Sequence, residues 1–244
     1  MLELYYDLHI HSCLSPCGNE EMTPQNIAGM MALSGYDIIA VADHNTTGNC
    51  RAVMEAARQV GILAVPAMEL TTREEVHVLC LLPDLDAARH FGQYVYAKLP
   101  NIPNRADIFG RQLYMDAQDQ IIGEEEKLLL SAADIGMYEV YGLVKSYGGT
   151  AIPAHADRHS FSLLSNLGYY DSAMGFPAME FTEQCDSRAF QLAHNIHLPY
   201  MVNSDAHTLA QMPDPKRKLR LKTPSAEGVI HAIEESGKFV TFLT

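Results

Sequence analysis

Two histidines, His9 and His11, stand two residues apart in a stretch with the composition of a β-strand. Residues i and i+2 of a strand point to the same face, so both imidazoles can be aimed at one point. Near the other end of the chain, Asp205 and His207 repeat this spacing with a carboxylate and an imidazole. These groups are the ligands that zinc, manganese and iron take in proteins. The two pairs therefore predict a metal-dependent hydrolase.

Further candidate ligands directly follow apolar runs that have the character of buried strands. They are Asp43 and His44, Glu69, and His155. In a parallel barrel the carboxyl ends of all strands meet at one mouth, and active sites are built there. His77 instead opens its apolar run, which fits the same mouth if a hairpin precedes it and its strand runs antiparallel. We expect all these side chains to converge on one metal site.

The elements that must position these residues alternate along the chain. Near-continuous apolar runs are typical of parallel strands that are buried on both faces. We predict strands at 4–9, 37–42, 62–70, 76–82, 149–154, 178–181, 200–203 and 239–242, and helices at 23–34, 47–60, 187–194 and 225–236. This alternation predicts an α/β fold with a parallel sheet.

The length of 244 residues fits one α/β barrel, so we predict a single domain over residues 1–244. The segment from about 83 to 147 interrupts the alternation and is rich in Asp, Gln, Glu and Tyr. We interpret this segment as a helical insertion that forms a lid or cap.

Taken together, the motifs resemble the PHP (polymerase and histidinol phosphatase) domain family. The matching pieces follow the family's order and span nearly the whole chain: Asp7-Leu8-His9-Ile10-His11-Ser12, Ala42-Asp43-His44-Asn45, Ala67-Met68-Glu69-Leu70, His77-Val78-Leu79, Pro153-Ala154-His155-Ala156-Asp157-Arg158 and Ser204-Asp205-Ala206-His207. The resemblance implies a distorted (β/α)7 TIM-like barrel, the PHP fold, with two or three divalent metal ions (Zn, Mn or Fe).

The resemblance also implies a role for each candidate ligand. Glu69 would bridge two metals. One site would be completed by His9, His11 and Asp205, the second by His77 and His155, and a third by His44 and His207.

The chain departs from the family after the first motif, where many members carry an acidic third-metal ligand. Here the segment contains Pro16, which cannot bind a metal, followed by Cys17, Glu20 and Glu21. Cys17, Glu20 or Glu21 could substitute for that ligand, and Asp43, Cys17 or Glu20 could take part in a third metal site or contact the substrate. A thiolate would favour zinc. The alternative for Cys17 is a turn cysteine without a ligand role.

Two adjacent metals suit hydrolysis of a phosphate monoester of a small metabolite or nucleotide through a metal-activated hydroxide. Asp205 or His207 could accept or return a proton. Arg158 follows His155 by three residues and is the candidate phosphate clamp, because guanidinium groups pair bidentately with phosphate oxygens. The alternative for Arg158 is a solvated loop arginine.

Three other functions stay open. An exonuclease on short oligonucleotides could stack bases on Tyr94, Tyr96 and Tyr114. An amidohydrolase is disfavoured, because such barrels usually need a bridging carboxylated lysine and no lysine ends a core strand here. A non-catalytic metal-binding module would be expected to lose ligands that this chain keeps.

Composition limits the binding partners and the cellular location that we expect for the protein. The formal net charge of −13 argues against long nucleic acid, and the cations at 216–222 suit a solvated edge segment. Five cysteines without a CxxC pair and no signal peptide predict a reduced, cytoplasmic protein. The sequence contains no apolar run of about 18 residues, so we do not expect a membrane span. Oligomeric state and substrate identity are not determined by these patterns.

Overall fold

A computed structural model describes residues 1–235 and 241–242 of the chain. Its main sheet has the strand order β11-β10-β1-β2-β3-β4-β7, and a separate parallel pair is formed by β8 and β9. The bounds are β1 Leu2–Ile10, β2 Ile38–Val41, β3 Leu63–Thr71, β4 His77–Leu81, β7 Thr150–Pro153, β8 Met179–Phe181, β9 Tyr200–Val202, β10 Arg217–Leu221 and β11 Thr241–Phe242. The last predicted strand, 239–242, lies partly outside the described residues.

The strand directions explain why the start of β4 lies beside the carboxyl ends of the parallel strands. Strands β1, β2 and β3 are parallel, whereas β4 pairs antiparallel with both β3 and β7. The hairpin expected at 71–75 is therefore confirmed, and it brings the start of β4 to the carboxyl end of β3. This geometry gives His77 the same location as residues that follow the parallel strands.

Backbone hydrogen bonds outside the paired strands connect the main sheet to the pair β8 and β9, and so continue its curvature. Ala156 N donates to Glu180 O at 2.8 Å, which joins the end of β7 to β8. Asp205 N donates to His9 O, and His11 N donates to Ala206 O, both at 2.9 Å, which joins the end of β9 to β1. The result is a mixed α/β fold with a curled sheet, in agreement with a distorted barrel. The hairpin between β3 and β4 departs from a strict strand–helix repeat.

Four predicted helices form close to the expected positions. They are α1 Pro24–Ser34, α2 Cys50–Gln59, α7 Ser187–Ala193 and α8 Ala226–Glu234. The Thr23 side chain accepts from Asn26 N, as expected for an N-cap followed by proline. The final residue of the predicted helix at 225–236 lies outside the described residues. Shorter elements are α6 Leu163–Leu167, η1 Ser172–Met174 and η2 Leu209–Gln211.

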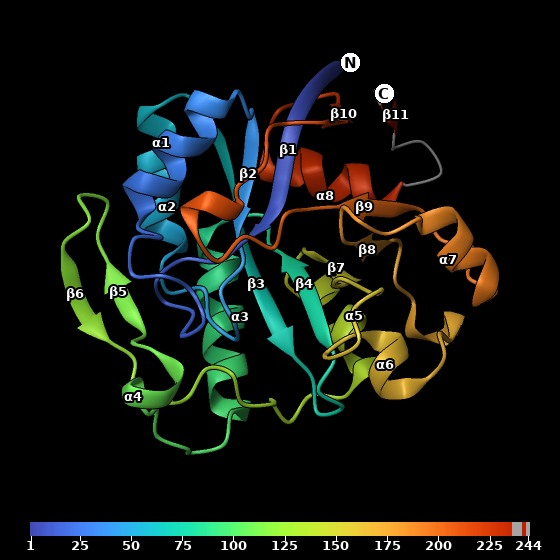
Figure 1. The fold of residues 1–244 in the computed structure, drawn as a ribbon, viewed down its shortest axis with the longest axis horizontal. Helices are drawn as coiled ribbons and strands as arrows, with labels where there is room; N and C mark the ends of the chain where they lie inside the picture. The colour runs from blue at the N-terminus through green and yellow to red at the C-terminus, as the bar shows by residue number, and fades with distance from the viewer. Residues whose placement is uncertain (236–240, 243–244) are drawn as a thin grey trace.

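Two apolar layers surround the strands. The inner core contains Leu8, Ala40, Leu79 and Ile152 from four strands, together with Val229 and other residues of α8. An outer layer places α1 and α2 against β2 and β3. Figure 1 shows α1 and α2 on one side of the central strands and α7 at the opposite edge of the molecule.

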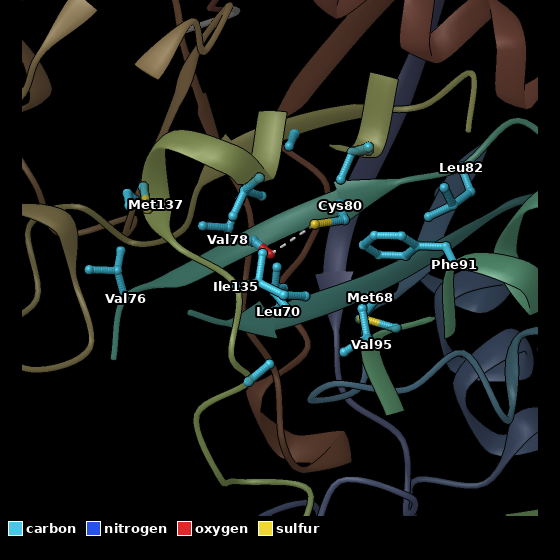
Figure 2. Close-up of a cluster of buried hydrophobic side chains, with 14 of the residues drawn as sticks. Met68, Leu70, Val76, Val78, Cys80, Leu82, Phe91, Val95, Ile135 and Met137 are labelled. Carbon is cyan, nitrogen blue, oxygen red and sulfur yellow. Dashed lines mark hydrogen bonds between the residues drawn. The ribbon is translucent and has the colours of Figure 1, made fainter. Parts of the chain in front are cut away.

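The segment 83–147 contains helices, as predicted, but also a β-hairpin. Its elements are α3 Leu85–Lys98, α4 Ala106–Phe109, β5 Leu113–Met115, β6 Ile121–Glu124 and α5 Met137–Ser146. Figure 2 shows Phe91 and Val95 of α3 beside Met68, Cys80 and Leu82 of the sheet region, in one buried apolar cluster. The helices of this segment thus contribute directly to the core. The role of the segment as a lid or cap stays a prediction.

No helix within the described residues has both the length and the apolar composition needed to cross a membrane.

Candidate metal centre

The two histidines of the first motif do face one point, and they lie next to a local irregularity of β1. The pairing of β1 with β2 shifts register between Asp7 and Ile10. Leu8 packs in the inner core, whereas Ile10 packs in the outer layer, so the alternation of side chains changes at this bulge. His9 and His11 are fully buried, and their Nε2 atoms lie 3.2 Å apart.

Glu69 lies at the centre of the cluster, at the carboxyl end of β3. Its Oε1 lies 3.3 Å from His9 Nε2, 3.0 Å from His77 Nδ1 and 3.0 Å from His155 Nε2. Its Oε2 lies 3.3 Å from His11 Nε2 and 3.0 Å from His44 Nδ1. One buried carboxylate is therefore shared among five imidazoles that come from the ends of four strands, β1, β2, β4 and β7.

Asp205 and His207 complete one side of the cluster. Asp205 Oδ1 lies 3.4 Å from His9 Nε2 and 3.0 Å from His11 Nε2. The ring of His207 stacks on that of His11 with 4.1 Å between centroids. The second predicted pair, 196 positions after the first in the sequence, thus meets it in space.

The donor atoms fit divalent metal ions. Within the part of the chain that the structure describes, three groups have ligand atoms within 4.8 Å of one another: His9, His11, Glu69 and Asp205; His44, Glu69 and His77; and His11, His44 and His207. The buried Nδ1 atom of His155 has no hydrogen-bond partner among the described residues, so it can still interact with another group. Imidazole with carboxylate is the donor set of zinc, manganese and iron.

The groups differ in part from those that the family resemblance implies. The first matches the set of His9, His11 and Asp205 with Glu69. The second group contains His44 together with Glu69 and His77, whereas the resemblance implies His77 and His155. His155 lies outside this group, but its Nε2 is 3.0 Å from Glu69 Oε1.

Opposite charges compensate the burial of this cluster. Burial alone would lower the pKa of His11 and His44, but contacts with the carboxylates outweigh it and raise each pKa to about 9. Burial would raise the pKa of Glu69, but the surrounding histidines hold it well below its usual value. Burial and the neighbouring His11 lower the pKa of His207 to about 3, so this imidazole is neutral at neutral pH.

A second carboxylate, Glu180, was not predicted from the sequence. It is the middle residue of β8, is almost fully buried, and both its oxygens lie 3.0 Å from His9 Nδ1. Asn203 Nδ2 also donates to Glu180 Oε2 at 3.0 Å. A hydrogen bond at Nδ1 fixes the ring orientation and leaves Nε2 as the free ligand atom. The signal that could have identified it is an acidic residue inside the apolar run that forms β8, because such a residue needs a buried partner.

Asp43 is buried beside the cluster, but its oxygens are already occupied. Oδ1 accepts from Ser15 Oγ at 2.7 Å and from Ser12 N at 2.8 Å, and Oδ2 accepts from Ser12 Oγ at 2.6 Å. Ser15 Oγ lies 2.9 Å from His11 Nδ1. Asp43 therefore contacts His11 indirectly, through Ser15, and is not among the donor atoms that would bind a metal.

The remaining predicted residues lie at different depths. Arg158 reaches the rim, where its Nη1 lies 2.6 Å from Asp205 Oδ2 while the side chain stays 43% exposed. Cys17 is exposed and lies near His44, where its side chain contributes to the raised pKa of that imidazole. Glu20 is exposed and makes none of the contacts, among the described residues, that build the cluster.

Several rim residues adopt left-handed backbone conformations that non-glycine residues rarely take. The φ angles are 53° at Asn45, 29° at His155, 54° at Phe161 and 51° at Asp205. Such conformations cost free energy and concentrate where a site constrains the backbone. Phe161 is also stacked on His77, with 4.9 Å between ring centroids.

The fold is similar to several solved structures. Endonuclease Q from Pyrococcus furiosus, a lesion-specific endonuclease, aligns with a TM-score of 0.73 and 20% identity over 98% of this chain and 58% of its own. Its complex with a 27-mer duplex that carries an abasic lesion at the active site aligns with a TM-score of 0.69, 20% identity and the same coverage. This chain thus spans little more than half of the endonuclease.

Two further structures resemble the chain. A two-domain Bacteroides vulgatus protein that contains a predicted PHP-like metal-dependent phosphoesterase aligns with a TM-score of 0.59 and 15% identity over 99% of this chain and 65% of its own. An amidohydrolase from Chromobacterium violaceum aligns with a TM-score of 0.58 and 18% identity over 91% of this chain and 93% of its own.

No family model and no curated protein matches the sequence. The structural likenesses, all at 20% identity or below, establish the architecture that surrounds the buried His/Glu/Asp cluster. The chain has a PHP-type fold.

Proposed function

We propose that this protein is a metal-dependent phosphoesterase, built on a distorted seven-strand barrel, that hydrolyses a phosphate monoester of a small metabolite or nucleotide. The observation that carries the proposal is the sharing of Glu69 among five histidines, with Asp205 beside two of them. A single carboxylate in this position can bridge neighbouring ions. When bound, divalent ions supply positive charge that polarises phosphoryl oxygens and ionises water near neutral pH.

The histidines and carboxylates would hold these ions in two or three sites. His9, His11, Glu69 and Asp205 would form one site, and His44, Glu69 and His77, with His155 beside Glu69, would form a second. His207 with His11 and His44 would contribute to a third.

Arg158 and His207 lie where substrate would approach. Arg158 is half-exposed at the rim, so its guanidinium can bind phosphate oxygens as they arrive at the cluster. His207 is neutral at neutral pH and partly exposed, so a lone pair of its imidazole is available at the open side of the site. Arg158 would orient the phosphate there, and His207 would hold a metal ion or relay a proton.

The test is a substrate panel with protein whose content of manganese, zinc or iron has been measured. Phosphate monoesters should be hydrolysed, and activity should disappear after chelation and return with metal. A panel that also includes amide substrates separates this proposal from C–N bond cleavage, which the fold by itself does not exclude. Metal-loaded protein that cleaves no phosphate ester would contradict the proposal.

Nucleic acid is the second candidate substrate, and the likeness to endonuclease Q favours it. That likeness weakens the argument against long nucleic acid made from the charge of −13. The cations at 216–222 give little support for nucleic-acid binding, because Lys216 pairs with Glu183 and Arg220 pairs with Glu3. Incubation with a five-nucleotide RNA and with a duplex that contains an abasic site, at matched metal content, would separate exonuclease, endonuclease and phosphatase activity.

A further inference from the structure

A cavity of about 430 Å³ lies outside the metal centre, between the first turn of α2, one face of α3 and the hairpin β5–β6. None of the proposed metal ligands lines it. Its volume falls within the range of small-molecule sites. Its lining combines two arginines, two tyrosines and one buried carboxylate. This combination indicates a ligand with a negative group, a planar ring and a hydrogen-bond donor.

The rim of the cavity is positive although the chain as a whole is acidic. Arg51 and Arg89 both line it, from α2 and α3. Each arginine has an acidic neighbour on its own helix: Arg51 Nη1 lies 3.9 Å from Glu55 Oε1, and Arg89 Nη2 lies 3.5 Å from Asp86 Oδ1 and 3.1 Å from His90 Nε2. Such exposed pairs hold a guanidinium weakly. Both arginines are more than half exposed and can exchange these partners for phosphate, for which the planar guanidinium is well matched.

The cavity also offers aromatic surface. Tyr96 and Tyr114 line it, and both hydroxyls donate to Glu125, at 3.1 Å and 2.6 Å. Lys127 Nζ lies 4.3 Å from the centroid of the Tyr96 ring, over one of its faces, and Tyr96 as a residue is 37% exposed. A common partner holds the hydroxyls of both tyrosines, so the aromatic surface that remains open is preformed, and a planar base can stack on it.

Glu125 itself has capacity for one more donor. Oε1 accepts from Tyr96 Oη and from Lys127 N, whereas Oε2 accepts from Tyr114 Oη. A carboxylate offers about four lone-pair sites, so one of them on Oε2 remains. The exocyclic amino group of a base would satisfy it.

Buried hydrogen bonds hold the hairpin wall in place. Asn49 is fully buried; its Nδ2 donates to Leu113 O at 3.1 Å, and its Oδ1 accepts from Met115 N at 3.0 Å. Leu113 and Met115 flank Tyr114, so the backbone that carries the Tyr114 ring is anchored. A preformed wall lowers the ordering cost of binding.

We propose that this cavity binds a nucleoside monophosphate with an amino-bearing base. The phosphate contacts Arg51 and Arg89, the base stacks on Tyr96 and Tyr114, and its amino group donates to Glu125. The site is independent of the reaction at the metal centre.

The test is calorimetric titration of the full-length protein with the phosphonate analogue of adenosine monophosphate, in which a CH2 group replaces the bridging oxygen and blocks hydrolysis. The analogue should bind, and this binding should persist after chelation of divalent ions, so the outcome does not depend on the proposed phosphoesterase. The corresponding inosine analogue, which lacks the amino group, should bind at least about tenfold more weakly.

Two double variants with the same charge change separate specific from general electrostatic effects. Arg51→Glu with Arg89→Glu should weaken binding by roughly tenfold or more. Arg105→Glu with Arg111→Glu alters two exposed arginines outside the cavity and should leave binding unchanged. Tyr96→Ala, with circular dichroism to verify folding, should weaken binding by about tenfold through lost stacking.

Three results would overturn the proposal. They are no binding before or after chelation, equal losses in the two double variants, and equal affinity for the adenosine and inosine analogues.

Discussion

Glu180 contacts His9 with both carboxylate oxygens, each 3.0 Å from Nδ1, although the two residues are 171 positions apart. Because Nδ1 is engaged, Nε2 of His9 is the atom presented to Glu69 and Asp205. The HxH motif thus depends on a carboxylate that lies outside every recognised motif.

Replacement of Glu180 should weaken metal binding without changing the fold. We expect Glu180→Ala to reduce metal affinity by roughly 10- to 100-fold, because the ring of His9 loses its orienting partner. Glu180→Gln should restore part of this loss, since its amide oxygen can still accept from Nδ1. Glu183→Gln, three residues later and engaged with Lys216 at the surface, is the matched control. Metal content by mass spectrometry is the readout, and equal affinity in all three variants would contradict the assigned role.

Substitution of Glu69 should have a larger effect than substitution of any single histidine. Glu69→Gln removes the charge shared by five imidazoles, so the measured stoichiometry should fall by at least one ion per chain. Phosphoesterase activity should fall by roughly three orders of magnitude, since several kcal/mol of charge stabilisation are lost. A variant that keeps full metal content would show that Glu69 is not the bridge.

Metal binding should release protons at neutral pH. The carboxylates outweigh the effect of burial and raise the pKa of His11 and His44 to about 9, so without metal these imidazoles are protonated at pH 7. A ligand imidazole must be neutral, and apparent metal affinity should therefore rise between pH 6.5 and 9. Calorimetry in buffers of different ionisation enthalpy measures the number of protons released. A value of zero at pH 7 would be incompatible with these raised pKa values.

The same groups give the metal-free protein a defined pH dependence. A histidine whose pKa is higher in the folded state contributes stability that is complete below its unfolded pKa, near 6.5. This contribution is lost as pH rises through the folded value of about 9. We expect the unfolding midpoint of chelated protein to fall across this window, and the fall should disappear in the double variant His11→Gln with His44→Gln.

Arg158 is expected to affect substrate binding more than metal binding. A hydrogen bond to a charged group contributes about 1.5–3 kcal/mol, so Arg158→Ala should raise KM for a phosphate monoester by roughly 10- to 100-fold. Its pairing with Asp205 is at the rim, and metal content should stay close to that of the parent protein. Arg188→Ala, an exposed arginine on α7, is the control. Unchanged KM would identify Arg158 as a solvated loop residue.

Phe91 tests whether the segment 83–147 is part of the structural core. Its ring is fully buried against sheet residues that include Met68 and Cys80. Phe91→Ala should therefore lower the free energy of unfolding by about 3–5 kcal/mol. Denaturant unfolding provides the measurement, and Phe109→Ala, at a half-exposed position of the same segment, should have little effect. A small effect at Phe91 would indicate that the segment is only loosely attached.

Much of the cluster could be predicted because its signals are local. His9 and His11 share a face through the period of two of a strand, and Glu69 and Asp205 follow apolar runs that become β3 and β9. The antiparallel course of β4, and with it the place of His77, followed from the short connection after Thr71. Thr23 marked the start of α1 through capping chemistry.

The sequence by itself determined which residues stand at strand ends, because backbone periodicity and capping act over a few residues. Only the tertiary structure decided their partners. Glu180 meets His9 and Asp43 lies behind His11 because the curled sheet and its bulge bring together segments that are distant in the chain. The cavity beside Arg51 and Arg89 likewise exists only where two helices and a hairpin pack together, a contact that no local pattern encodes.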